Sequence, residues 1–335
     1  MELYLDSADI NEIREVSKFG FITGLTTTPT FMHRHGITDV DAAIVELSKL
    51  VDVLQIEALG SNAEEIVKEA YRQEALGLDR KKTVYKIPIS MEGVKACRQL
   101  VNEGFLVNIH LVYTLQQAYM AMQAGATYVC PLVGRLQDEG HDALALVEQC
   151  VDAVNYYNYN TKIMFSSVRN AEHVRNAINL GTHTVTVPWK IMKQLTENNF
   201  TTIGTQQFEE HTRLMTVKVG DAIRDKNPIV KANYTIADCL VQMSSGGFGA
   251  VTIVDDDNMA IGFFSDGDLR RFLEKGGDIK STLKQSISLK KPLTISSDEL
   301  LFKAHELFNL HKVDELVVVN NENKVVGMLD VQDLV

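Results

Sequence analysis

The feature that most constrains the fold is a repeated alternation of short apolar strands and amphipathic helices over roughly the first 205 residues. Segments such as 39–51 and 92–102 carry apolar residues at three- and four-residue spacing, which is typical of helices that bury one face. The expected strands end near Asp6, Leu25, Glu57, Ile87, His110, Pro131, Phe165 and Val187. Strands that are each followed by a helix favour a parallel sheet, and eight such units close a TIM (β/α)8 barrel. We therefore expect an α/β chain that begins with such a barrel.

Polar residues fall where these strands end, which is the face that carries the chemistry in barrels of this kind. The residues are Asp6, Glu57, Lys86, Asn108 and His110. A single one of them would be explained as a helix cap or a satisfied core group. The convergence of all of them favours a site.

Lys86 is the most informative of these residues because it belongs to the apolar, β-branched run Thr83–Pro88. Lysine is seldom buried without a partner, and an ammonium group removed from water favours the free amine. A free amine can attack a sugar carbonyl and form a Schiff base. Alternatively, Lys86 reaches water from the strand end. Strand alternation turns Lys86 and Val84 into the barrel and Tyr85 and Ile87 toward the helices.

The composition limits which binding partners and which cellular compartment we expect. The formal net charge is −11 and no Lys- or Arg-rich run occurs, so nucleic acid and membrane are not expected as partners. The four cysteines are scattered, without the spacing of a zinc site or a disulfide framework. The start of the sequence reads as a strand rather than a signal peptide, and no apolar run approaches a membrane span. We expect a cytoplasmic protein with about two domains in its 335 residues.

Several motifs along residues 1–215 occur in the order and spacing of a known family. They are MELYLDSAD at the start, TGLTTTPT at 23–30, KIPISMEG at 86–93, AGATYVCPLVGR at 124–135 and SSVRN at 166–170. Together they resemble the small transaldolase/fructose-6-phosphate aldolase family of class I aldolases. The resemblance implies sugar-phosphate substrates, covalent catalysis by a lysine Schiff base, and no metal or other cofactor.

The resemblance also implies a role for each matching residue. Lys86 becomes the Schiff-base nucleophile, Asp6 an acid/base group, and Glu57 a carboxylate that acts through a water. The residues expected to bind substrate are Thr26, Thr28, Asn108, Arg135, Ser167 and Arg169, the last three at the sugar phosphate. A guanidinium fork suits a phosphate, and two carboxylates beside one lysine can divide the proton transfers. The alternatives remain that Asp6 is a cap, that Glu57 pairs with a barrel cation, and that the arginines lie on the surface.

Three positions depart from the family pattern. Thr28 stands where the family has an asparagine in its TTNPS motif. Alternatively, Thr26, Thr27 and Thr28, which precede a proline, are only turn formers. His110 stands where a threonine usually holds the catalytic water, so its imidazole either relays the proton or is a packing substitution. Leu132 replaces an aromatic residue and cannot supply a phenol. These changes place the protein off both main branches of the family and leave its substrate open.

From about Val217 the chain shows an internal repeat of roughly 60 residues. Each copy contains a strand, a turn and a second strand. A short motif follows at 261–269 and at 326–334: Gly, two apolar residues, Ser or Asp, and then a further Asp at the start of a helix. This pattern resembles a CBS domain pair, which implies a nucleotide-binding regulatory module spanning 217–335, with copies 217–280 and 281–335. The implied nucleotide ligands are Ser265, Asp268, Asp330 and Asp333. Each of them can equally serve as a helix cap.

The run DDDNMAIGFFSDGDLRRFLEKGGDI at 255–279 is similar to the CBS pair of arabinose-5-phosphate isomerases, which supply the precursor of the sugar Kdo. This similarity suggests that the barrel joins glycolaldehyde and D-glyceraldehyde 3-phosphate into arabinose 5-phosphate, with a nucleotide sugar such as CMP-Kdo as effector. The first alternative is a fructose-6-phosphate aldolase or transaldolase that transfers a dihydroxyacetone unit. A second is a non-catalytic sugar-phosphate or nucleotide sensor. Both resemblances imply a homo-oligomer.

Overall fold

The computed structural model describes residues 1–286, 288 and 290–334. The chain divides into two compact units, Met1–Glu197 and Asn198–Val335. Each unit has its own sheets and its own apolar cores. No described helix has the length and the apolar character needed to cross a membrane.

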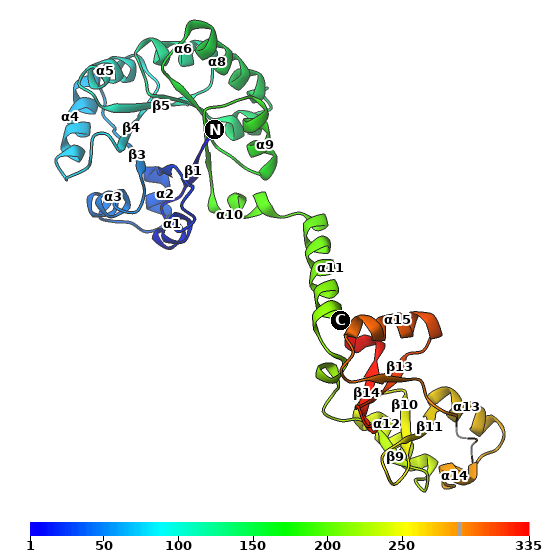
Figure 1. The fold of residues 1–335 in the computed structure, drawn as a ribbon. Coiled ribbons are helices and arrows are strands. Elements are labelled where there is room, and N and C mark those ends of the chain that lie inside the picture. The colour runs from blue at the N-terminus through cyan, green and yellow to red at the C-terminus, as the bar shows by residue number, and fades with distance from the viewer. Residues whose placement is uncertain (287, 289, 335) are drawn as a thin grey trace. The chain divides into compact units, whose positions relative to one another are not determined.

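The first unit is a closed barrel of parallel strands in chain order, β1 to β8, with β1 paired to β8 (Figure 1). The strands are β1 (Glu2–Asp6), β2 (Gly24–Thr26), β3 (Val53–Glu57), β4 (Thr83–Pro88), β5 (Leu106–Val112), β6 (Tyr128–Pro131), β7 (Lys162–Phe165) and β8 (Thr184–Val187). The fold class expected from the sequence is confirmed, and the strand ends agree within two residues.

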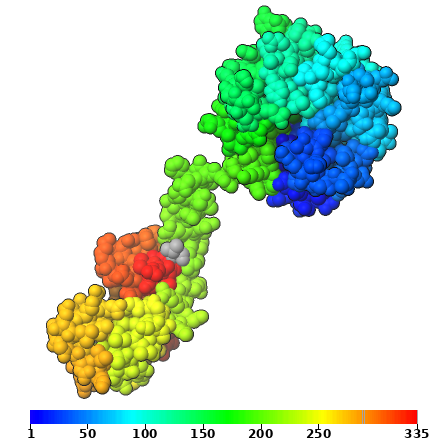
Figure 2. All heavy atoms as spheres, turned by 180° about the vertical axis from the view of Figure 1, so that it is seen from behind, coloured from blue at the N-terminus to red at the C-terminus, as the bar shows by residue number. Residues whose placement is uncertain are grey.

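Helices surround the barrel and follow the strands in chain order, so the colour in Figure 2 passes around this unit from blue through cyan to green. They are α1 (Ile10–Ser17), α2 (Pro29–Arg34), α3 (Val40–Ser48), α4 (Ala63–Glu74), α5 (Met91–Asn102), α6 (Leu115–Gln123), α7 (Val133–Asp138), α8 (Ala143–Tyr157), α9 (Ala171–Asn179) and α10 (Trp189–Met192), followed by the 3-10 helix η1 (Lys193–Thr196). The largest apolar core lies between strands and helices and includes Tyr85 and Ile87.

A second, smaller core fills the interior of the barrel. Val84 packs there with Tyr4, Tyr128 and Met164. Since successive side chains of a strand point to opposite faces, Val84 and Lys86 share the interior face of β4. The alternation expected for the Thr83–Pro88 strand is therefore confirmed.

The second unit contains two similar three-stranded sheets, ordered β11-β10-β9 and β12-β13-β14. In each sheet the central strand is parallel to one neighbour and antiparallel to the other. The first copy comprises β9 (Ile229–Lys231), α12 (Ile236–Gly246), β10 (Ala250–Val254), β11 (Ala260–Ser265) and α13 (Asp266–Glu274). The second comprises β12 (Thr294–Ser296), α15 (Leu301–His311), β13 (Glu315–Val319), β14 (Val325–Asp330) and the 3-10 helix η3 (Val331–Leu334).

The segments that precede the two copies are exchanged between them. Leu214 near the end of α11 (Asn199–Thr216), and Val219 in the 3-10 helix η2 (Val219–Ala222), are buried in the core of the second copy. Leu283 in α14 (Leu283–Ser286) is buried in the core of the first copy. Helix α11 therefore belongs to the second compact unit.

Candidate active site

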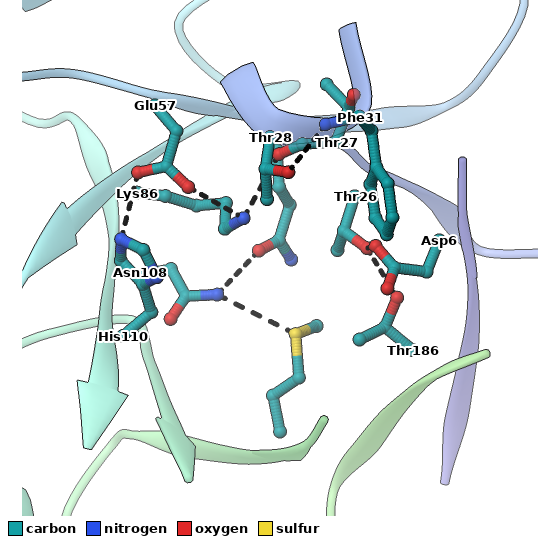
Figure 3. Close-up of polar contacts among 12 residues, drawn as sticks. Asp6, Thr26, Thr27, Thr28, Phe31, Glu57, Lys86, Asn108, His110 and Thr186 are labelled. Atoms are coloured by element: carbon teal, nitrogen blue, oxygen red, sulfur yellow. Dashed lines mark hydrogen bonds and ion pairs between the residues drawn. The ribbon is translucent and has the colours of Figure 1, made fainter. Parts of the chain in front are cut away.

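Lys86 lies inside the barrel near the C-terminal end of β4, between Glu57 of β3 and Asn108 of β5 in the strand register. Its Nζ is 2.9 Å from Glu57 Oε1 and donates a hydrogen bond to the carbonyl oxygen of Thr27 at 3.1 Å (Figure 3). The Lys86 and Glu57 side chains are each only 6% exposed. The strand-end lysine therefore does not reach water: it is buried and paired with a carboxylate.

His110 extends this pair, because its Nε2 lies 2.9 Å from the second oxygen of Glu57 (Figure 3). The contact has ion-pair distance but not the alignment of a hydrogen bond. Burial opposes the charged form of Glu57, yet Lys86 and His110 outweigh it, and the pKa of Glu57 lies below its ordinary value. Glu57 is thus an ionised carboxylate that joins an amine to an imidazole.

Asp6 forms the opposite wall of the site (Figure 3). Its Oδ1 accepts a hydrogen bond from Thr26 Oγ1 at 2.8 Å, and the Thr26 hydroxyl is also bonded to that of Thr186 on β8. Burial raises the pKa of Asp6, and the charge of Lys86 and the Thr26 hydrogen bond offset this only in part. Asp6 therefore keeps its proton to a higher pH than an exposed aspartate does.

Thr28 has a local role that the sequence left open. Its side chain is the N-cap of α2 and accepts a hydrogen bond from the Phe31 backbone N–H at 3.3 Å. Pro29 occupies the first turn of this helix, where a missing N–H costs nothing. Thr28 is thus a helix cap, while its hydroxyl proton remains available to another acceptor.

Asn108 is fully buried in the barrel interior, next to Lys86 in the register. Its Nδ2 donates to Gln55 Oε1 at 2.7 Å and contacts the sulfur of Met164 at 3.6 Å. Gln55, on β3, was not among the residues expected from the sequence. Its position two residues before Glu57 in a strand is the signal that would have found it.

The three residues expected at a sugar phosphate lie on adjacent segments after β6 and β7. Arg135 is in α7 and donates to Tyr113 Oη at 3.2 Å, whereas Arg169 donates to Asp138 at 2.9 Å. Ser167 has a left-handed backbone conformation, with φ of 59°. Both guanidinium groups are exposed, and each keeps donors that these bonds do not use.

Gly134 explains how closely these segments approach. A Cβ at this position would lie 2.0 Å from the Ser167 carbonyl oxygen and 2.8 Å from Arg169 Nε. Only glycine permits this approach, so Gly134 brings the loop after β7 against the start of α7. Leu132, just before it, is bridged through its backbone to Ser166.

The expected nucleotide ligands of the second unit all take part in local capping. Ser265 caps α13 and forms a capping box with Asp268, whose other oxygen accepts from Arg271 at 2.7 Å. Asp333 accepts from the Asp330 backbone N–H at 2.9 Å and from Arg224 Nε at 2.7 Å. Local hydrogen bonds of this kind therefore occur in both motifs, and they engage both carboxylate oxygens of Asp268 and of Asp333.

A metal site was not expected, and the described residues contain no cluster of three His, Cys, Asp or Glu side chains that could hold a metal ion.

A closed parallel barrel with a buried, ion-paired lysine at the C-terminal ends of its strands is the frame of a lysine-centred barrel enzyme. The family model for transaldolase/fructose-6-phosphate aldolase matches residues 3–231, and that for the CBS domain matches 219–275 and 284–335. The chain belongs to the transaldolase/fructose-6-phosphate aldolase family and carries a CBS domain pair. It is an enzyme of the aldolase or transaldolase type.

Curated relatives are similar to the barrel unit. A "Probable transaldolase" of a Thermoanaerobacter species is 37% identical over 220 residues, which cover 65% of this chain and 100% of the relative. The corresponding protein of Clostridium acetobutylicum is 36% identical over 209 residues, covering 62% of this chain and 95% of the relative. A CBS domain protein from Pyrobaculum aerophilum, solved as a complex with AMP, is 18% identical and covers 35% of this chain and 89% of that one, with a TM-score of 0.32.

Proposed function

We propose that this enzyme is a class I aldolase in which Lys86 forms a Schiff base with a short hydroxylated donor and adds it to D-glyceraldehyde 3-phosphate. The observation that supports this most directly is the burial of Lys86 against Glu57 at the C-terminal ends of the strands. A pure binding protein has no need for a desolvated amine beside a carboxylate.

The ionisable side chains of the site can carry out the proton transfers that such a reaction needs. The Lys86 amine adds to the donor carbonyl, and loss of water from the carbinolamine gives an iminium ion. Loss of the α-proton then gives an enamine, whose carbon forms the new bond to the aldehyde carbon of the acceptor, and water finally releases the product from Lys86. We assign proton transfers at Lys86 to Glu57 and His110, and those at the substrate hydroxyls to Asp6.

His110 is the proposed replacement for the water that the family holds at this point. It lies 2.9 Å from Glu57, so a proton taken up by Glu57 can pass directly to an imidazole. An imidazole side chain can both accept and return a proton, which suits a step that must run in both directions.

The phosphate of the acceptor is assigned to Arg135, Ser167 and Arg169. Guanidinium groups bind phosphate through paired N–H donors, and the arginines stand on segments that Gly134 brings together. Thr26, Thr28 and Asn108 are assigned to the donor end, close to Lys86 and Asp6.

The favoured product is arabinose 5-phosphate, formed when the two carbons of glycolaldehyde join the three of glyceraldehyde 3-phosphate. Thr28 lacks the amide of the family's asparagine and Leu132 lacks the phenol or ring found in its relatives, so the donor end differs from both branches of the family. The second candidate is transfer of a dihydroxyacetone unit. Glu57 favours it, because a carboxylate at this position matches the transaldolase branch.

The CBS pair is proposed to bind a nucleotide or nucleotide sugar such as CMP-Kdo and to adjust the activity of the barrel. The proposed contacts are Ser265 and Asp268 in the first copy and Asp330 and Asp333 in the second. A cytoplasmic location and a homo-oligomeric state complete the proposal. Sedimentation of the purified chain measures the latter.

A product assay tests the proposed reaction. The purified protein is incubated with D-glyceraldehyde 3-phosphate and either glycolaldehyde or dihydroxyacetone, and the sugar phosphates are resolved by chromatography with mass detection. The proposal predicts arabinose 5-phosphate from glycolaldehyde and its loss in Lys86→Met. Fructose 6-phosphate alone would establish the second candidate, and no product from either donor would refute both.

A further inference from the structure

Strand β5 contains an irregularity directly after His110. Leu111 has a backbone φ of 56°, in the left-handed region that a leucine side chain disfavours. The other non-glycine residues with positive φ in the described part of the chain lie in turns, loops or helix caps, so Leu111 is the one inside a strand. A strained backbone of this kind persists only where the surrounding structure holds it, and such residues cluster at functional sites.

The irregularity is a β-bulge. Where β5 and β6 pair, β6 passes through residues 129–131 while β5 passes through 109–112, which is one residue more. His110 and Leu111 of β5 therefore stand opposite a single residue of β6. On its other side β5 stays in the ladder, because the His110 carbonyl oxygen accepts a hydrogen bond from the Ile89 backbone N–H at 3.0 Å.

The bulge determines which face of β5 each side chain occupies. Ile109 and Val112 are both fully buried in the core between strands and helices. In a regular strand, residues three apart point to opposite faces, so Val112 would point into the barrel with His110. Leu111 is partly buried and belongs to neither apolar core of the described barrel unit. The extra residue thus lets β5 bury Val112 outside the barrel while His110 stays inside.

His110 has to lean across a strand to meet Glu57. The register sets Glu57, Lys86 and Asn108 in one row across β3, β4 and β5. His110 lies two residues beyond Asn108, about 7 Å further along β5, and β3 is two strands away. Its Nε2 nevertheless lies 2.9 Å from Glu57 Oε2 (Figure 3). The imidazole is therefore directed sideways, over β4, rather than straight into the barrel.

We propose that Leu111 is a positioning residue whose left-handed backbone directs the His110 imidazole at Glu57. A bulge bends the strand that carries it and re-aims a neighbouring side chain, and here that side chain is the proposed proton relay. The role belongs to the backbone of Leu111 and not to its side chain, so any residue that accepts a positive φ should serve. This inference rests on the proposed Schiff-base function.

Substitutions of Leu111 separate a backbone role from a side-chain role. Glycine and asparagine adopt a positive φ readily, whereas β-branched isoleucine resists it. With the donor that the product assay identifies, we expect Leu111→Gly and Leu111→Asn to keep kcat within about threefold of the native value. Leu111→Ile should lower kcat by about tenfold or more, with a smaller change in KM. A side-chain role predicts the reverse order, because isoleucine keeps the apolar volume that the other two remove.

The effect of Leu111→Ile should pass through His110. In a His110→Phe background it should change kcat no further, since the imidazole that it misdirects is absent. The matched control is Leu106→Ile, the same change at a partly buried leucine in the regular part of β5, which should leave kcat unchanged. Circular dichroism and borohydride trapping on Lys86 show whether each variant folds and forms the adduct.

Loss of kcat in folded Leu111→Gly and Leu111→Asn, or native kcat in folded Leu111→Ile, would overturn the inference alone. A further loss of kcat from Leu111→Ile in the His110→Phe background would also overturn it. If Leu111→Ile does not fold, the glycine and asparagine variants still decide, because a side-chain role requires both to lose kcat. Absence of any trapped adduct in the native protein would instead refute the proposed function, and this inference with it.

Discussion

At the scale of single residues, the site consists of two carboxyl groups whose environments drive their pKa values in opposite directions. Glu57 lies between Lys86 and His110, and its pKa is lowered despite burial. Asp6 lies among neutral threonines, and burial raises its pKa although Lys86 opposes the shift. Such divergence is how one site assigns an acid role and a base role to the same kind of side chain.

These two pKa shifts predict that neutralising Asp6 and neutralising Glu57 change the stability of the protein in opposite directions. Because the folded protein binds the Asp6 proton more tightly than the unfolded chain, stability falls as pH rises through the raised pKa. Asp6→Asn should therefore raise the melting temperature at pH 8 more than at pH 4, while it slows catalysis. Glu57 contributes stability above its ordinary pKa, so Glu57→Gln should lower the melting temperature at pH 8. Thermal denaturation of both variants measures this, and equal signs would contradict it.

His110 carries a separate prediction. If it relays the proton from Glu57, His110→Phe should lower kcat by about 10² to 10⁴ with a smaller effect on KM. His110→Thr, which restores the family residue, should recover part of the loss by admitting a water. Steady-state kinetics of the two variants distinguishes a proton relay from a packing role. If His110 only packs, kcat should be nearly unchanged in His110→Phe.

At the scale of elements, the phosphate end depends on the contact between α7 and the loop after β7. Gly134→Asn places a side chain where the Ser167 carbonyl and Arg169 now lie. We expect KM for glyceraldehyde 3-phosphate to rise and the barrel to be destabilised, while borohydride trapping of the donor on Lys86 persists. Gly204→Ala in α11 is the matched control, because a Cβ there meets nothing within 4 Å. An unchanged KM in Gly134→Asn would contradict the assignment of this loop.

The barrel strands and the interior face of Lys86 could be predicted from the sequence because each strand is a short apolar run with a polar end. The sequence could not predict the Gln55–Asn108 hydrogen bond, since strand alternation indicates which face each residue shares but not which side chains meet across the barrel. It also could not predict that Arg224 engages Asp333, because an ion pair between residues so far apart depends on the folded second unit.

The sequence also could not predict the exchange of segments between the two CBS copies. The repeat shows which residues of the two copies correspond, but not against which copy each preceding segment packs. Val219 bonds through its backbone to Glu299 of the second copy, and Leu283 bonds to Tyr234 of the first. The apolar character of Val219 and Leu283 predicts that they are buried, but not in which core.

At the scale of the whole molecule, the two compact units should unfold as separate transitions, and α11 should follow the second. Leu214 of α11 is buried in the core of the second CBS copy, so Leu214→Ala should cost that unit about 2–5 kcal/mol. Leu100→Ala, in the barrel core, should lower only the other transition. Differential scanning calorimetry separates these cases, and a Leu214→Ala effect on the barrel transition would contradict the assignment of α11.

The central claim is that Lys86 holds the donor covalently, and borohydride trapping followed by peptide mass mapping tests it most directly. Reduction in the presence of glycolaldehyde should add the mass of the reduced two-carbon unit to the peptide that contains Lys86. Lys86→Met should abolish the adduct, whereas Lys82→Met, at an exposed lysine before β4, should not. An adduct on another lysine, or none with any short aldehyde or ketone, would contradict the account.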